Sequence, residues 1–165
     1  MDGLCQTYRE NPLMTSVDFG LRVARLNSAP LALVLVEIKQ FESLGQRYAQ
    51  HLHDCVKLVR ASINHSLASS GDLYVTWFAQ EMFGGILPGA SPGVALTIAA
   101  NILKNLAGIT IPYRYSSICH KVEFSIGVGV MQQVQKECVA EHVVALACSA
   151  LDLARGVDSP QIMVF

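Results

Sequence analysis

Short, fully apolar segments alternate along this chain with longer ones in which apolar residues recur every three or four positions. Leu31–Val36 is an unbroken apolar run after Pro30, which is typical of a strand buried on both faces. From Phe41 to Leu67 the apolar residues recur at helical spacing. This predicts an amphipathic helix, and we expect Gly45 to divide it, because glycine weakens a helix interior.

The rest of the chain continues this alternation of strand and helix patterns. We predict strands at Leu73–Phe78 and Met82–Leu87, a turn at Ala79–Glu81, a helix at Gly93–Leu106, a β segment at Ile109–Tyr115, a strand at Val122–Val130, a helix at Cys138–Ala154 and a closing strand at Gln161–Phe165. The order predicts an α+β fold with a ferredoxin-like, palm-type βαββαβ core plus an added helix and strand. Helices would flank a central, mostly antiparallel sheet, and helices on one face would explain the apolar composition.

Composition narrows the class of protein. The 165 residues suffice for a single domain, 52% are hydrophobic and only 15% are charged, which indicates extensive burial. A net charge of −1 without a basic stripe argues against nucleic-acid binding. No apolar run is long enough for a membrane span, and the first residues lack a signal peptide. We therefore expect a cytoplasmic domain, or the cytosolic part of a membrane protein, with no membrane contact from this segment.

Two acidic residues stand where chemistry would be expected. Glu37 follows the most apolar strand, and Glu81 lies in the predicted hairpin turn. If the two strands are neighbours, both carboxylates lie at one end of the sheet. Such a pair could bind Mg²⁺ together with substrate phosphates, as phosphoryl-transfer and nucleotidyl-transfer sites do. An ordinary solvated strand end is the competing interpretation.

Four segments together resemble the GGDEF (diguanylate cyclase) family of cyclic di-GMP signalling proteins. They are LALVLVEIKQFESLGQRYAQHLHD at 31–54, YVTWFAQEMFGGILPGA at 74–90, FSIGVGV at 124–130 and LACSALDLARGVDSPQI at 146–162. They occur in the family's order and spacing, which is far more specific than one motif. The resemblance implies a helical lead-in at residues 1–29 and a degenerate GGDEF domain at residues 30–165.

The resemblance also shows which family positions have changed. The signature Gly-Gly-Asp/Glu-Glu-Phe becomes AQEMF, so Ala79 and Gln80 replace the glycines that approach the nucleotide and Met82 replaces an acid. Lys39 replaces the second acid of the first strand and Glu42 a lysine, while Gly45 replaces an asparagine that contacts guanine. The family's product-inhibition motif, Arg-x-x-Asp, is missing from residues 70–73.

The positions that the resemblance retains are Glu37 and Glu81 for metal and Asp54 and Arg155 for nucleotide, with Ala79 and Gln80 as altered nucleotide positions. Losing several coupled groups usually abolishes turnover. We therefore expect no enzyme activity and no required cofactor, with Mg²⁺ bound only together with GTP. The resemblance implies a regulatory domain that forms a homodimer, docks on another domain such as an EAL phosphodiesterase, or binds GTP without turnover.

Two alternatives stay open at this stage. A divergent, active diguanylate cyclase would use Glu37 and Glu81 to make cyclic di-GMP from GTP with Mg²⁺. A ferredoxin-like binding module without any nucleotide is also compatible with the order of elements, because a fold does not fix a function.

Overall fold

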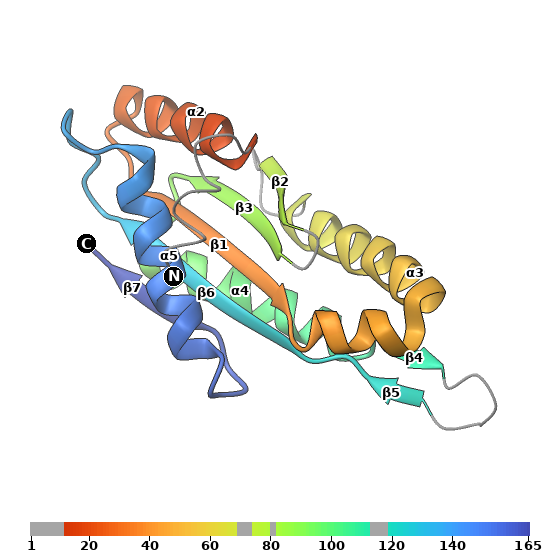
Figure 1. Ribbon diagram of the computed structural model, residues 1–165. Coiled ribbons are helices and arrows are strands. Elements are labelled where there is room, and N and C mark those ends of the chain that lie inside the picture. Colours follow the sequence, from red (N-terminus) through yellow and green to blue (C-terminus); the bar gives the residue numbers. More distant parts are fainter. Residues whose placement is uncertain (1–11, 69–73, 80–81, 113–118) are drawn as a thin grey trace.

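The computed structural model describes residues 12–68, 74–79, 82–112 and 119–165, which form a central sheet with helices on both faces (Figure 1). In chain order the elements are α2 (Pro12–Leu26), β1 (Leu31–Ile38), α3 (Phe41–Ala68), β2 (Tyr74–Ala79), β3 (Met82–Pro88), α4 (Pro92–Leu106), β4 (Thr110–Pro112), β5 (Cys119–Lys121), β6 (Phe124–Met131), α5 (Ala140–Ala154) and β7 (Gln161–Val164). Within these ranges no helix combines the length and the apolar character needed to cross a bilayer.

The main sheet has five strands in the order β2-β3-β1-β6-β7. The apolar strand β1 lies in the middle and pairs antiparallel with both β3 and β6. At one edge β7 pairs parallel with β6. The predicted α+β fold with a mostly antiparallel sheet is therefore confirmed, and the strand richest in aliphatic residues is the central one, where both faces are covered.

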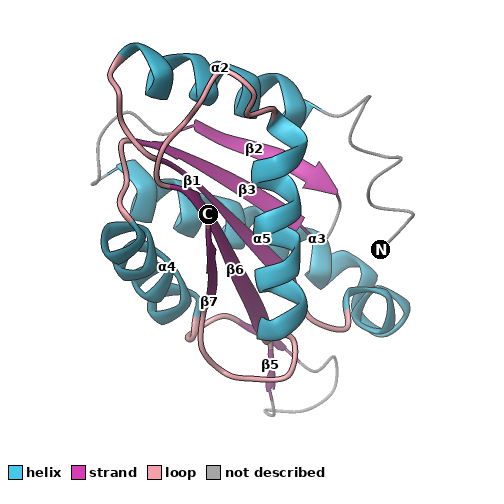
Figure 2. Ribbon diagram, turned by 90° about the vertical axis from the view of Figure 1, so that its left-hand side faces the viewer, coloured by secondary structure: helices cyan, strands magenta, loops and turns pink. Residues whose placement is uncertain are grey.

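Two layers of helices bury the two faces of the sheet (Figure 2). Along β1, Leu31, Leu33 and Leu35 pack in one apolar cluster with residues of α2 and α5. The alternate residues Ala32, Val34 and Val36 pack in a second cluster with residues of α3 and α4. The expectation of helices on one face was wrong. Because successive side chains of a strand point to opposite faces, a continuous apolar run requires cover on both.

Close contact between α5 and β6 depends on glycine. A Cβ atom at Gly127 would lie 2.3 Å from the backbone nitrogen of Leu151. At Gly129 it would lie 2.5 Å from the backbone nitrogen of Ala147. Both distances are shorter than any real contact, so the helix backbone rests directly on the strand. This contact fixes the position of the C-terminal end of α5.

Two local features differ from the prediction. Helix α3 is kinked at Tyr48, whose φ and ψ are −138° and 40°, and not at Gly45. The segment predicted as Ile109–Tyr115 is only the short strand β4, and it forms a separate two-stranded sheet with β5. Strand β5 was not predicted, because three residues are too few to show a periodicity. Strand β1 also runs to Ile38, so Glu37 lies inside it.

Candidate functional site

The end of β1 brings three side chains of different chemistry side by side. Glu37 pairs with Met82 on β3 and with Ser125 on β6. Residues directly opposite each other on neighbouring strands share a face, so all three belong to the face that α2 and α5 cover. Met82 is 2% exposed and packs in the apolar cluster of that face. Ser125 is buried, and its Oγ has no hydrogen-bond partner among the described residues.

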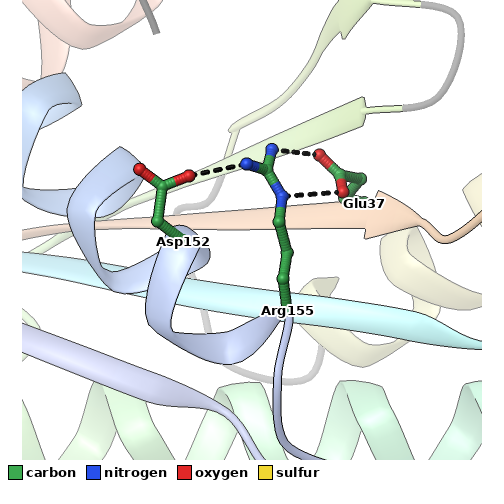
Figure 3. A network of polar contacts seen from close by, with 3 residues as sticks. All are labelled: Glu37, Asp152 and Arg155. Atoms are coloured by element: carbon green, nitrogen blue, oxygen red, sulfur yellow. Dashed lines mark hydrogen bonds and ion pairs between the residues drawn. The ribbon is translucent and has the colours of Figure 1, made fainter.

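Arg155 holds Glu37 through both carboxylate oxygens (Figure 3). Its Nε donates to Oε1 over 3.1 Å and its Nη2 donates to Oε2 over 2.7 Å. Its remaining terminal nitrogen, Nη1, donates to Oδ1 of Asp152 over 2.6 Å. The guanidinium therefore joins the end of α5 to the end of β1, in the two-pronged geometry that arginine and carboxylate groups favour.

The fold favours the positive charge at this place. Arg155 is the C-cap residue of α5, and a cation at the carboxyl end of a helix is stabilised by the helix dipole. Its hydrogen bond to Glu37 is the main cause that raises the pKa of the guanidinium. The charges of Glu37 and Asp152 act in the same direction, against partial burial. The side chain of Glu37 is 15% exposed and that of Arg155 41%, so the carboxylate is the better shielded of the two.

A recess of about 490 Å³ opens beside this ion pair, at the turn from β1 to α3. Glu37 and Glu42 both line it, together with Gln40 and Phe41. Gln40 has a φ of 56°, in the left-handed region that non-glycine residues rarely adopt. The recess thus has two carboxylates in its lining and a strained residue in its turn, a combination that is common at functional sites.

The other predicted site residues are distributed as follows. Asp54 is exposed on α3 and lines neither the strand-end recess nor the second recess, of about 560 Å³, which Gly45 and His53 border. Ala79 is the last residue of β2 and pairs with Met82. Gln80, Glu81 and the window at 70–73 lie outside the described residues. Of the predicted set, the structure brings Glu37 and Arg155 together.

The described residues do not fit a divalent metal ion at the strand end. A magnesium ion needs oxygen ligands in near-octahedral geometry. Here both oxygens of Glu37 are bound to Arg155, and the neighbouring Met82 offers only a thioether. The part of the chain that the structure describes contains no group of three or more His, Cys, Asp or Glu side chains that could hold a metal.

Sequence reasoning missed the contact between Glu37 and Arg155 and the role of Asp152 in it. The spacing of Asp152 and Arg155 by three helical positions could have suggested their ion pair. The contact with Glu37 spans 118 positions along the chain and depends on how α5 crosses the sheet. No local pattern reports such a contact.

Comparison with known proteins identifies one family that the chain matches. The family described as "Diguanylate cyclase, GGDEF domain" matches residues 1–155 of the chain. No curated protein matches it in sequence.

Solved GGDEF domains share the fold at low sequence identity. The chain resembles the active GGEEF domain of a diguanylate cyclase from Vibrio cholerae, with 12% identity, coverage of 93% of this chain and 94% of that one, and a TM-score of 0.76. It also resembles the GGDEF domain of DgcB from Caulobacter crescentus in complex with c-di-GMP, with 14% identity, 92% and 84% coverage and a TM-score of 0.77. An EAL/GGDEF domain protein from M. capsulatus is also similar, with 20% identity, coverage of 88% of this chain and 92% of that one, and a TM-score of 0.62.

Proposed function

Because the chain belongs to the GGDEF domain family of diguanylate cyclases, we propose that it is a regulatory member that does not make cyclic di-GMP. The observation that carries this proposal is the pairing of Met82 with Glu37 at the end of β1. The family resemblance expects an acid at position 82. Instead a buried apolar side chain packs there, and its thioether can neither serve as a ligand for Mg²⁺ nor carry charge.

The charges around the strand-end recess also disfavour turnover of a nucleoside triphosphate. The resemblance places a lysine, which would neutralise phosphate, at the position that Glu42 occupies in the lining. A carboxylate there repels phosphate oxygens. Removing one group that stabilises a transition state costs about 3–4 kcal/mol in well-studied enzymes. Losing an acid and reversing a charge in the same site is expected to reduce turnover below detection.

A domain without turnover can still act in three ways: by forming a dimer, by docking on another domain, or by binding GTP unproductively. Domain docking draws support from the M. capsulatus relative, which is described as an EAL/GGDEF domain protein. An attached EAL phosphodiesterase domain is therefore the partner we propose first. Unproductive GTP binding would use the altered or retained nucleotide positions Asp54, Ala79, Gln80 and Arg155, with Mg²⁺ arriving only on the nucleotide.

The competing function is a divergent active cyclase. Its basis is Glu37, which keeps a carboxylate at the strand position that the resemblance assigns to metal. Such an enzyme would need Glu81 as the second acid and a second copy of the domain facing the first.

The deciding experiment combines a turnover assay with calorimetric titration. The purified chain is incubated with GTP and Mg²⁺ or Mn²⁺, and cyclic di-GMP is measured by chromatography. We expect no product. Product that disappears in a Glu81→Ala variant would overturn the proposal in favour of the active cyclase.

Titrations with GTP and with cyclic di-GMP, each with Mg²⁺, then separate the modes of regulation. GTP binding that is weakened by Asp54→Asn, but not by Asp18→Asn, would establish a nucleotide sensor. Asp18 is a matched control because it is also an exposed aspartate within a helix, on α2. The absence of heat with both ligands would favour docking on a protein partner.

A further inference from the structure

The ion pair at the end of β1 is built from more than two residues. Asp152 lies one turn before Arg155 on α5 and accepts a hydrogen bond from Nη1, the guanidinium nitrogen that is not bonded to Glu37. The end of α5 is held in place by the direct contact of its backbone with β6. The guanidinium is therefore aimed at Glu37 by a rigid helix and by a second carboxylate, and little conformational freedom is lost when the pair forms.

Arg155 occupies the atoms that a metal ion would need. A cation bound at the end of β1 must coordinate Oε1 or Oε2 of Glu37, and both accept a hydrogen bond from the guanidinium. A metal ion brought close to Glu37 would also be repelled by the charge of Arg155. The carboxylate is thus neutralised from within the chain.

We propose that Arg155 is an internal cation that takes the place of a divalent metal ion at Glu37 and keeps the strand-end site closed to such ions. This inference rests on the proposed function, since the resemblance is what assigns Glu37 to a metal site. It goes further, because it names the group that excludes the metal. It also explains how a carboxylate that is only 15% exposed is tolerated at this place, because a bidentate arginine compensates its charge.

Oxygen ligands remain available once the arginine is removed. Glu37 would regain two free oxygens, and the buried hydroxyl of Ser125 lies opposite it in the β1–β6 ladder. Glu42 lines the adjoining recess. Replacing Arg155 by a neutral side chain should therefore open a cation site at the end of β1.

The inference is tested by measuring how tightly the full chain binds Mn²⁺. Calorimetry gives the affinity, and the electron paramagnetic resonance signal of free Mn²⁺ measures it independently. Arg155→Met keeps an extended side chain and removes the charge. We expect it to bind Mn²⁺ more tightly than the natural chain by on the order of tenfold, because a competing positive charge is gone. The double variant Arg155→Met/Glu37→Gln should lose that gain. Arg155→Lys, which keeps the charge, should stay close to the natural chain.

Arg22→Met is the matched control, because Arg22 is an exposed arginine on α2 rather than at the strand end. It should leave Mn²⁺ binding unchanged. Two results would overturn the inference: Mn²⁺ binding by the natural chain that Glu37→Gln abolishes, or an Arg155→Met variant without any gain. If Arg155→Met does not fold, the inference is tested by the melting temperatures of the natural chain and of Glu37→Gln, each measured with and without Mn²⁺. Equal increases in melting temperature support the inference, and a larger increase for the natural chain contradicts it.

These measurements can fail independently of the proposed function. Mn²⁺ binding at Glu37 without cyclic di-GMP synthesis would refute the role of Arg155 as an internal cation but leave the proposed regulatory function intact. Cyclic di-GMP synthesis by the natural chain would refute the proposed regulatory function itself.

Discussion

Because the Cys55 thiol on α3 is buried, we expect the domain to lose stability as the pH rises into the alkaline range. The residue is 3% exposed, and burial raises the pKa of its thiol above the ordinary value. In the unfolded chain the thiol ionises near pH 8.5. Above that pH the folded chain therefore retains a proton that the unfolded chain has released. The stabilising contribution is complete below about pH 8.5 and is lost as the pH rises through the higher value of the folded state.

We expect the free-energy difference between the natural chain and Cys55→Ala to be constant up to about pH 8 and to shrink above pH 8.5, by at most about 1.4 kcal/mol per pH unit. Urea unfolding between pH 7 and pH 10, in the presence of a reductant, measures this difference. Because the comparison is between two chains that share all other ionisable groups, their effects cancel. A difference that stays constant up to pH 10 would contradict the prediction.

The candidate site shows what single residues can and cannot reveal in a sequence. Glu37 is conspicuous because an acid follows an apolar run, whereas only the family resemblance pointed to Arg155. The structure then joins them at 2.7 Å. That contact depends on where the C-terminal end of α5 lies above β1. Ser125 gave no signal at all, because its importance comes from its neighbour across the ladder.

At the scale of elements, the packing of α5 on β6 depends most on the absence of side chains. Gly127→Ala would place a methyl group 2.3 Å from the backbone nitrogen of Leu151 and 2.7 Å from the carbonyl oxygen of Ala147. Backbone atoms cannot move aside as a flexible side chain can, so the helix must lift from the sheet. We expect a loss of about 3 kcal/mol or more in the free energy of unfolding, the upper end of overpacking costs.

Thermal or urea unfolding of Gly127→Ala beside Gly93→Ala checks this prediction. Gly93 lies in the first turn of α4, where a Cβ atom would meet nothing within 4 Å. That control should be neutral or gain up to about 1 kcal/mol, because alanine restricts the unfolded chain. Equal stability of the two variants would show that α5 does not rest on the strand as closely as the structure places it.

The order of the long elements was readable from the sequence, and the details that failed share a cause. Runs such as Leu31–Val36 and the spaced apolar residues of α3 carry a strong periodic signal. The kink at Tyr48 and the β4–β5 pair do not, because a kink interrupts no apolar pattern and strands of three residues are too short to show a period. The continuous apolar run of β1 implies cover on both faces, which the expectation of helices on one face did not take into account.

At the scale of the whole molecule, Arg25 ties α2 to the segment that leads into α5. Its side chain donates hydrogen bonds to the backbone carbonyl oxygens of Gln135, Lys136 and Cys138, the first two over 3.2 and 3.4 Å. Helices α2 and α5 cover the same face of the sheet, and α5 in turn is joined to β1 through Arg155. A chain of contacts therefore runs from α2 across α5 to the strand-end site.

If this tie is local, Arg25→Met should loosen α2 without unfolding the sheet. Hydrogen bonds from a charged group to carbonyl oxygens contribute about 1.5–3 kcal/mol, and partial exposure places Arg25 near the lower value. A loss of one to two kcal/mol corresponds to roughly 5–30-fold faster opening. We expect amide hydrogen exchange, followed by mass spectrometry, to accelerate by that factor in α2 and in residues 132–138, and to stay unchanged in α3.

Arg22→Met, one turn earlier on the exposed side of α2, should leave the exchange of all three segments as it is. A uniform acceleration that includes α3 would mean that Arg25 stabilises the fold as a whole, and equal exchange in both variants would mean that the tie contributes nothing. Acceleration confined to one face has a functional consequence. A regulatory domain needs an element that can shift while its core stays folded. Under the regulatory function proposed above, α2 with Arg25 as its tie would be that element, and through α5 it would act on the pair of Glu37 and Arg155.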